Sequence, residues 1–561
     1  MEQKQPASTT AQTATTSVQI ETIADAKDAN TAEHSLTLWQ ALNLYPRGVM
    51  WSLVMSTAVV MEGFDTKLLG TLYAHSAFRK HFGVHVKGDH WEITAAWQAG
   101  LSNGSIIGQL AGLLVAGYLC ERFGFRKSML AGLALITGLI FISFFAKSLV
   151  MLLIGQILFG VPLGFFQTVS VIYALEITPL CLRAYLTNYV NFCWAFGQII
   201  CVGVLRALLN RNDQWSYRIP FALQWFWPVM LIPLVYLAPE SPWWLVRAGR
   251  LDEARASVKR LTSARNIDFD VDKSVALMLV TTEHERNLDN RTSYVACFSK
   301  GNLKRTFIGI GIYCVQTLSG NPIRGSSTYF LQQAGMSTSL SFTMSIVGYG
   351  VAILGGFFSG SVATANCAAT TTIKTPIWLL LPLFGRRSMY VSSLVLMFFL
   401  MLVIGSLGVP QASHPASSYS WAIGSILIIS SFLYNCSIGP LTNTLCSEIP
   451  SALLRSKSIV LARWTYALTN IVVSVLNPYM LNPTAWNWSA KAAFFWAGWC
   501  AVAVVFAFCY VPETKNRTTA ELDLLFDRKV STRKFHKTAV DPIAAIQTDM
   551  ETQEMRREST V

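Results

Sequence analysis

The octapeptide Glu176-Ile-Thr-Pro-Leu-Cys-Leu-Arg183 recurs roughly half a chain later as Glu448-Ile-Pro-Ser-Ala-Leu-Leu-Arg455. Each copy begins with a glutamate, ends with an arginine and follows a long run of residues without charge. A charged loop that returns at the end of two separate apolar runs indicates that the chain consists of two similar halves.

Two more loop motifs recur at a similar distance. Arg122-Phe-Gly-Phe-Arg126 is matched by Phe384-Gly-Arg-Arg387, and Pro239-Glu-Ser-Pro-Trp-Trp is matched by Pro512-Glu-Thr-Lys. Repeated halves in parallel orientation are a known architecture of membrane transporters. No enzyme motif predicts this set of repeats.

The stretches between these loops have the length of membrane spans, which need about 20 residues with little or no charge. They predict an all-α membrane protein with about twelve transmembrane helices, six before residue 239 and six after residue 304. A polar break near residues 411–420 divides one long stretch into two spans. The charge-free runs lie between Arg47 and Glu62, Glu92 and Glu121, Lys127 and Lys147, Lys147 and Glu176, Arg183 and Arg206, Arg218 and Glu240, Arg324 and Lys374, Arg387 and Glu448, Arg463 and Lys491, and Lys491 and Glu513.

The composition indicates that most of the chain is surrounded by lipid, and it argues against a nucleic-acid-binding protein or a metalloprotein. Charged residues make up 13% of the chain and hydrophobic residues 52%, whereas soluble domains carry roughly 25% charge. The 44 Lys and Arg residues cluster in short loops, as cytoplasmic loops do, so no nucleic-acid partner is expected. The 11 scattered cysteines contain no CxxC pair, and we expect neither a metal nor a cofactor.

The basic loops follow the even-numbered spans, which places both termini in the cytoplasm by the positive-inside rule. We expect a disordered N-terminus at 1–47 without a cleavable signal peptide, and a first six-helix half at 48–238. After it we expect a cytoplasmic linker with short helices at 239–304, then a second six-helix half at 305–512 and a cytoplasmic tail at 513–561.

Together these motifs resemble the sugar porter branch of the major facilitator superfamily over about residues 48 to 526. Met61-Glu-Gly-Phe-Asp-Thr-Lys-Leu-Leu-Gly70, Gln316-Thr-Leu-Ser-Gly-Asn321, Ser327-Thr-Tyr-Phe330 and Asn482-Pro-Thr-Ala-Trp-Asn-Trp488 are similar to the fungal alpha-glucoside:proton symporters. The resemblance implies two pseudo-symmetric six-helix halves, import of a sugar with protons by alternating access, a monomer in the lipid bilayer, and the plasma membrane as its location.

Charged residues at the cytoplasmic ends of the spans are candidates for a latch between the halves. A carboxylate and a guanidinium form paired, directional hydrogen bonds, which can close an inner gate and then break. The alternative is that these residues only set the topology. The candidates are Arg122, Arg126, Glu176, Arg183, Glu240, Arg386, Arg387, Glu448 and Arg455.

Glu62 and Asp65 lie three residues apart within the first span, so they share a helix face. Carboxylates in hydrocarbon are costly and usually mark proton or ion paths, so both are candidates for proton coupling. The alternatives are an ion pair with Lys67 or Arg463, or a helix end that reaches interfacial water. Many proton-coupled sugar porters carry an arginine in the fourth span where this chain has Gln156. Arg463 in span eleven is the candidate for the partner charge, and its alternative role is a helix-end residue that reaches water.

The resemblance also points to sugar-binding residues, namely Asn191, Gln198, Gln316, Asn321 and Asn443. Amide side chains facing a cavity suit sugar hydroxyls. Their alternative role is hydrogen bonding between helices. Thr317 and Asn443 depart from the family pattern, which has a second glutamine and an aromatic residue there.

Residues 360–377 interrupt the eighth span with an Ala- and Thr-rich segment that carries Lys374. Removing them joins Phe357-Phe-Ser to the apolar run that begins at Trp378, so we expect an insertion, of the kind an unspliced intron leaves. A hexose facilitator without proton coupling and a sugar sensor that does not transport are the competing functions. No enzyme motif is present in the sequence.

Overall fold

The computed structural model describes residues 24–33, 35–87, 90–263, 269–289, 294–299, 301–365, 385–413, 417–451, 454–514, 517, 519–528 and 530–538. These residues form two compact units, the first mainly from residues before 290 and the second mainly from residues after 293. Apart from one two-stranded hairpin, the regular structure in the described ranges is helical.

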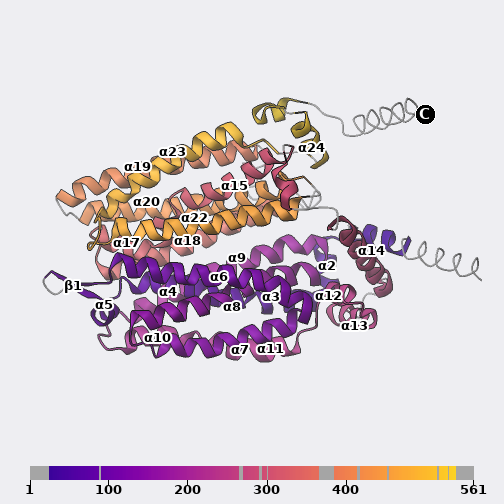
Figure 1. Ribbon diagram of the computed structural model, residues 1–561, viewed down its shortest axis with the longest axis horizontal. Coiled ribbons are helices and arrows are strands. Elements are labelled where there is room, and N and C mark those ends of the chain that lie inside the picture. Colours follow the sequence, from indigo (N-terminus) through magenta and orange to yellow (C-terminus); the bar gives the residue numbers. More distant parts are fainter. Residues whose placement is uncertain are drawn as a thin grey trace, which may run out of the picture. The chain divides into compact units, whose positions relative to one another are not determined.

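The first unit holds the helices drawn in indigo to magenta in Figure 1. Its hairpin pairs β1 (Val84–Lys87) with β2 (His90–Glu92) in antiparallel register. Its helices are α2 (Leu38–Leu44), α3 (Pro46–Ser56), α4 (Ala58–Leu72), α5 (Ser76–Phe82), α6 (Ala95–Phe123), α7 (Phe125–Phe144), α8 (Leu149–Ile177), α9 (Leu180–Ala207), α10 (Trp215–Leu223), α11 (Phe226–Leu237), α12 (Pro242–Arg247), α13 (Leu251–Leu261) and α14 (Val271–Asp289).

The second unit runs in colour from magenta to yellow in Figure 1 and repeats the arrangement of long helices. Its elements are η1 (Tyr294–Phe298), α15 (Leu303–Leu318), α16 (Asn321–Gly325), α17 (Ser327–Gln333), α18 (Thr338–Ala365), α19 (Arg386–Ser413), α20 (Ser417–Cys436), α21 (Ile438–Glu448), α22 (Arg455–Leu481), η3 (Ser489–Lys491), α23 (Ala492–Tyr510), α24 (Thr519–Asp527) and η4 (Thr532–Lys537).

Ten helices in the described part of the chain are long and apolar enough to cross a membrane. Five belong to each half, where they correspond to the predicted spans two to six and eight to twelve. The first span of each half is not among the ten, since α3 has 11 residues, α4 has 15 and α15 has 16. The predicted helical membrane architecture is therefore confirmed, with one broken helix at the start of each half.

The two interruptions differ locally. At Thr57, between α3 and α4, the backbone keeps helical angles, and both its N–H and its hydroxyl donate to the Leu53 carbonyl, at 3.1 Å and 2.9 Å. At Gly320, between α15 and α16, the backbone has φ +78°, which suits glycine, and Pro322 follows within the next helical turn. Both breaks lie close to residues that the sequence marks as functional.

Glycines allow close approach of helix backbones in the first unit. A Cβ at Gly63 of α4 would collide with the Trp194 carbonyl of α9, and one at Gly197 of α9 would collide with the Val60 carbonyl of α4. Membrane helices associate largely by packing of this kind, since lipid is as apolar as the side chains it would replace. Gly197 therefore fixes the distance between α4, which carries the acids, and α9.

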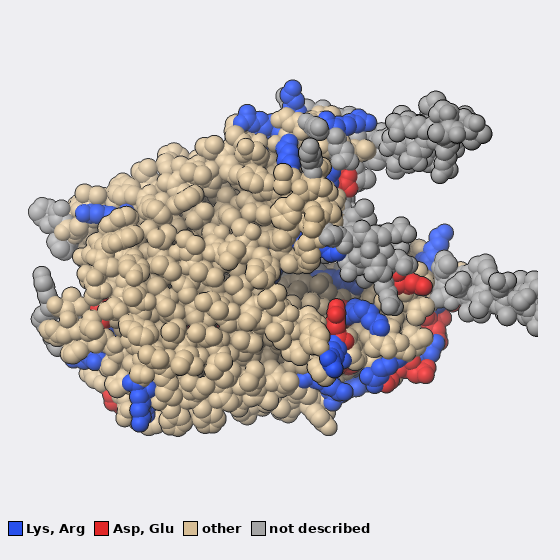
Figure 2. Space-filling model, in the orientation of Figure 1, with Lys and Arg blue, Asp and Glu red and all other residues tan. Residues whose placement is uncertain are grey.

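Charged side chains are sparse along the sides of the helices on the face shown in Figure 2. They gather beside α12–α14 in the first unit and near α24 in the second. This distribution agrees with apolar surroundings for the helix sides and water at the helix ends.

The predicted insertion at 360–377 falls mostly outside the described residues, which stop at Ala365 and resume at Gly385. Helix α18 continues to Ala365. The prediction of an insertion therefore stays a prediction.

Replacing Gly197 by alanine is expected to destabilise the protein, because the added methyl group meets backbone atoms of α4. Overpacking of this kind costs roughly 1–3 kcal/mol. Heating detergent-solubilised protein and measuring the monodisperse fraction should show a lower midpoint. Gly203→Ala is the matched control, since that Cβ on the same helix would meet nothing within 4 Å. Equal midpoints for the two variants would contradict the close packing of α4 and α9.

Candidate functional site

Two carboxylates lie buried inside the first unit on α4. Glu62 is 2% exposed and Asp65 is 4% exposed. In this unit Oε2 of Glu62 and Oδ2 of Asp65 are buried without a hydrogen-bond partner among the described residues. Carboxylates buried within a span are costly and are usually retained for a function.

Two glutamines lie at Asp65. The Gln224 side chain, at the junction of α10 and α11, donates a hydrogen bond from Nε2 to Asp65 Oδ1 at 3.0 Å. Gln156 on α8 is also buried and lies within interaction distance of Asp65. The residue that stands in place of the family's arginine therefore does lie beside the predicted coupling acid, as a neutral amide. The sequence motifs did not predict Gln224.

The two candidate sugar-binding residues of α9 differ in their surroundings. Gln198 is buried, and its Nε2 has no hydrogen-bond partner in the described part of the chain. Asn191, two turns earlier on the same helix, is exposed. A buried amide with an unused donor is suited to a ligand hydroxyl, whereas the exposed Asn191 is accessible without any movement.

In the second unit, Gln316 and Asn321 lie on either side of the break at Gly320, and both are half-buried. The Gln316 side chain lies within interaction distance of the Tyr434 hydroxyl on α20. Tyr434 is half-buried as well. The break therefore brings two amides and an aromatic ring to one region of the second half.

Another polar cluster of the same half lies between α15 and α21. The Tyr313 hydroxyl donates to Asn443 Oδ1 at 3.1 Å, joining α15 to α21. The ring of Tyr313 meets the ring of Tyr466 edge to face, with centroids 5.9 Å apart. Arg463 lies within interaction distance of Tyr313 and is itself exposed. Arg463 and Asn443 thus belong to one cluster.

Each half uses one carboxylate to cap the helix that follows its second span. In the first unit, Glu240 accepts from the backbone N–H groups of Phe125 at 2.8 Å and Arg126 at 3.2 Å. Its carboxylate thus lies against the N-terminus of α7, where unpaired N–H groups and the helix dipole favour an anion. Gly124 makes room for it, since a Cβ there would meet the carboxylate.

The second unit repeats this arrangement at α19. Glu513 accepts from the backbone N–H groups of Arg386 at 2.8 Å and Arg387 at 3.2 Å. A Cβ at Gly385 would collide with the Glu513 carboxylate. The sequence repeat of Pro239-Glu and Pro512-Glu is therefore a structural repeat of two helix caps.

A second pair of carboxylates lies next to these caps. Glu176 accepts a hydrogen bond from the hydroxyl of Ser241 and pairs with Arg247 at 2.7 Å. Glu448 pairs with Arg386, whose guanidinium also lies 3.4 Å from the Thr514 hydroxyl. Ser241 and Thr514 each follow the capping glutamate directly, so the repeat extends to the hydroxyl group.

The remaining predicted gate arginines make other contacts. Arg122 donates to the Tyr118 hydroxyl, Arg183 donates to the Thr178 carbonyl at 3.2 Å, and Arg387 donates to the Phe508 carbonyl. The Arg126 guanidinium lies over the Tyr236 ring. Arg455 is close enough to Glu448 for an attractive charge–charge interaction. Each of these contacts lies within one of the two units, and the contact of Arg122 lies within α6.

Burial raises the pKa of the Glu240 carboxyl above its usual value, while hydrogen bonds from the backbone N–H groups of Arg126, Ser241 and Phe125 act in the opposite direction. The capped helix therefore stabilises the charged form against desolvation.

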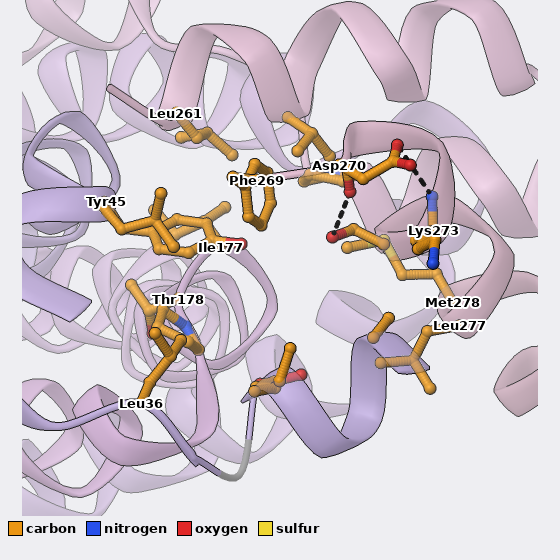
Figure 3. A pocket seen from close by; sticks show the side chains of 18 of the residues that line it. Leu36, Tyr45, Ile177, Thr178, Leu261, Phe269, Asp270, Lys273, Leu277 and Met278 are labelled. Atoms are coloured by element: carbon orange, nitrogen blue, oxygen red, sulfur yellow. Dashed lines mark hydrogen bonds between the residues drawn. The ribbon is translucent and has the colours of Figure 1, made fainter. Parts of the chain in front are cut away.

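A cavity of about 650 Å³ lies in the first unit, between the C-terminal end of α8 and helix α14. Figure 3 shows Tyr45 and Thr178 on one side of it and Lys273 and Met278 on the other. Glu176 and Arg183 are among its lining residues. Two predicted gate residues therefore share one cavity with the linker helices.

Comparison with known proteins identifies the family. Residues 51–526 match the family model described as "Sugar (and other) transporter". The chain belongs to this sugar transporter family. The transporter is 40% identical over 523 residues to a general alpha-glucoside permease of Saccharomyces cerevisiae, covering 92% of this chain and 81% of that permease. It is 39% identical over 531 residues to a maltose permease of the same yeast, covering 94% and 83%.

Solved structures support the fold of the transporter. A major facilitator superfamily proton:xylose symporter aligns with a TM-score of 0.62 and 19% identity over 86% of this chain and 99% of that chain. An inward-open xylose transporter from E. coli aligns with a TM-score of 0.65 and 18% identity over 84% and 98%. The predicted major facilitator fold is confirmed, and since the relatives are permeases the prediction that the chain is not an enzyme is confirmed too.

Glu240→Ala should make the sugar transporter less stable to heat, because three backbone N–H groups lose a charged acceptor. A hydrogen bond to a charged group contributes about 1.5–3 kcal/mol to the free energy of unfolding. The thermal midpoint of the solubilised protein measures the effect. Glu121→Ala removes an exposed acid at the end of α6 and should leave that midpoint unchanged. Similar midpoints for both variants would show that the cap contributes nothing.

Proposed function

We propose that this sugar transporter imports an alpha-glucoside such as maltose together with protons, by alternating access. The observation that carries the proposal is the buried pair Glu62 and Asp65 in a chain about 40% identical to alpha-glucoside and maltose permeases. We place it in the plasma membrane as a monomer with both termini in the cytoplasm, as the loop charges and the family resemblance favour.

Asp65 is the proposed proton carrier, and Glu62 assists it. When Asp65 is charged, its carboxylate accepts from Gln224 Nε2, with one oxygen left unpartnered. Protonation removes the charge and lowers the cost of enclosing the group in an apolar site. Helix α4 packs closely on α9, which carries Gln198. A change in the charge of Asp65 therefore alters the electrostatic surroundings of α9.

The proposed sugar contacts come from amides in each half. Gln198 and Asn191 on α9 serve in the first half, while Gln316 and Asn321 beside the Gly320 break serve in the second. Asn443 Oδ1 accepts a hydrogen bond from Tyr313, which fixes the orientation of the amide. Half-buried Tyr434 supplies the aromatic surface that sugar rings favour.

The proposed inner gate uses the charged residues of the helix caps. Glu176 pairs with Arg247 of the linker, Glu448 pairs with Arg386 of the second half, and Glu240 of the linker holds the start of α7. We propose that the two halves, 48–238 and 305–512, move as units that these caps keep rigid, while the linker at 239–304 joins them. The proposed cytoplasmic segments are 1–47 and 513–561.

Asp65→Asn should abolish sugar-linked proton entry, because an asparagine amide does not take up a proton at physiological pH. Exchange of sugar across the membrane should continue. The assay is external pH in cells that lack their own sugar carriers, followed after addition of maltose or glucose. Asp213→Asn, an exposed residue paired with Arg211 at 3.6 Å, is the control. Alkalinisation of equal size with both variants would remove Asp65 from the coupling path.

The same assay separates the competing functions. Sugar-dependent alkalinisation by the unmodified chain supports symport and names a substrate. Equilibration of sugar without any pH change favours the hexose facilitator, for which the neutral Gln156 is the structural argument. Protein at the cell surface without transport of either sugar favours the sensor.

Deleting residues 360–377 should increase transport, because it joins two apolar runs into one span of ordinary length. The measurement is sugar uptake per copy of protein at the cell surface, for the full and the shortened chain. Greater uptake by the full chain would contradict the insertion hypothesis, as would messages that retain the segment in most copies.

A further inference from the structure

Arg324 lies on α16, just after the break in the first helix of the second half, and its side chain is 6% exposed. In the sequence it only bounds a charge-free run. One guanidinium nitrogen, Nη1, donates to the Ser319 carbonyl at 3.0 Å and approaches Met397 Sδ at 3.3 Å. The other, Nη2, has no hydrogen-bond partner in the described residues.

The acceptor that remains for this cation is an aromatic ring. The Arg324 guanidinium carbon lies 4.3 Å from the centroid of the Tyr434 ring on α20. A cation over the face of an aromatic ring is attracted by the negative charge of that face, most strongly where water is absent. Because arginine is planar and weakly hydrated, it suits such a buried position better than lysine does.

Tyr434 connects this contact to the amide of the broken helix. Its hydroxyl lies within interaction distance of the Gln316 side chain, and the residue is half-buried, so part of it stays accessible. The ring therefore has one face on Arg324 and its hydroxyl beside Gln316. A buried charge in a membrane protein is costly and is usually retained for a function.

We propose that Arg324 is a positioning residue for sugar affinity, holding the Tyr434 ring so that its hydroxyl stays beside Gln316. The proposal rests on the proposed sugar transport, and Arg324 itself acts only through Tyr434. It links the break at Gly320 to the aromatic residue of α20, two features that lie more than a hundred residues apart in the sequence.

The test measures KM and the maximal rate of uptake for the sugar that the unmodified chain transports, corrected for the amount at the cell surface. Arg324→Met keeps the length of the side chain but removes the charge. It should raise KM about three- to tenfold, the range that an ordinary cation–π contact supports, with little change in the maximal rate. Arg324→Lys keeps a cation over the ring and should recover part of the affinity.

A double-mutant cycle tests whether the effect passes through the ring. Tyr434→Leu should raise KM as well, and the double variant should be no worse than the more affected single variant. Additive effects would overturn the proposal, as would an unchanged KM in Arg324→Met. Arg533→Met is the matched control: Arg533 follows the last span and lies 4.6 Å over the Phe508 ring of α23, far from the proposed sugar residues in the sequence, so its loss should leave KM unaltered.

Failure to fold is detected separately. Gln316→Ala in place of Tyr434→Leu repeats the cycle with a smaller change, and the monodisperse fraction of each solubilised variant gives its folded amount. Variants that are folded and at the surface, yet show no linkage between Arg324 and Tyr434 or Gln316, would overturn the positioning role. If the unmodified chain carries no sugar, the proposed transport itself fails.

Discussion

Hydrocarbon offers the backbone no hydrogen-bond partners, and this constraint determines the structure of the chain. At Thr57, in the first span of the first half, the backbone N–H still donates to the Leu53 carbonyl, so the interruption is mild. At Gly320, in the first span of the second half, the backbone adopts a positive φ that glycine permits. Glu62 and Asp65 follow the first break and Gln316 precedes the second. The polar chemistry of each half is thus located beside the point where its first helix is interrupted.

The same constraint applies where α7 and α19 begin. The first N–H groups of α7 and α19 would be unpaired, and in both halves a glutamate that follows the last span accepts from them. Gly124 and Gly385 are needed because a side chain there would displace the carboxylate. One physical problem has therefore been solved twice with the same residues, and this explains why the loop motifs repeat in the sequence.

The sequence alone predicts the parts of the fold that depend on local composition. Charge-free runs predict the spans, and the repeated loops predict two halves, because both are properties of neighbouring residues. Arg247 and Gln224 were missed, since their importance comes from lying against Glu176 and Asp65, far away in the chain. In the sequence, Arg324 marks only the end of an apolar run, because nothing there places Tyr434 beside it.

The latch illustrates a limit of pattern reasoning. Paired acids and arginines predict ion pairs, but the pattern does not say which residues pair. The structure pairs Glu448 with Arg386 and Glu176 with Arg247, and it gives Arg183 and Arg387 backbone carbonyls instead. Glu240, predicted as a gate charge, is held by backbone N–H groups. Its hydrogen-bond partners are the first N–H groups of α7, and the motif alone does not predict where that helix begins.

The central claim is that a proton on the α4 carboxylates drives sugar uptake. Its most direct test is purified protein in liposomes, with an imposed pH gradient that is acidic outside and no sugar gradient. The account predicts that internal sugar rises above the external concentration and falls back when a protonophore collapses the gradient. Internal sugar that reaches the external concentration but never exceeds it, with or without the gradient, would contradict it.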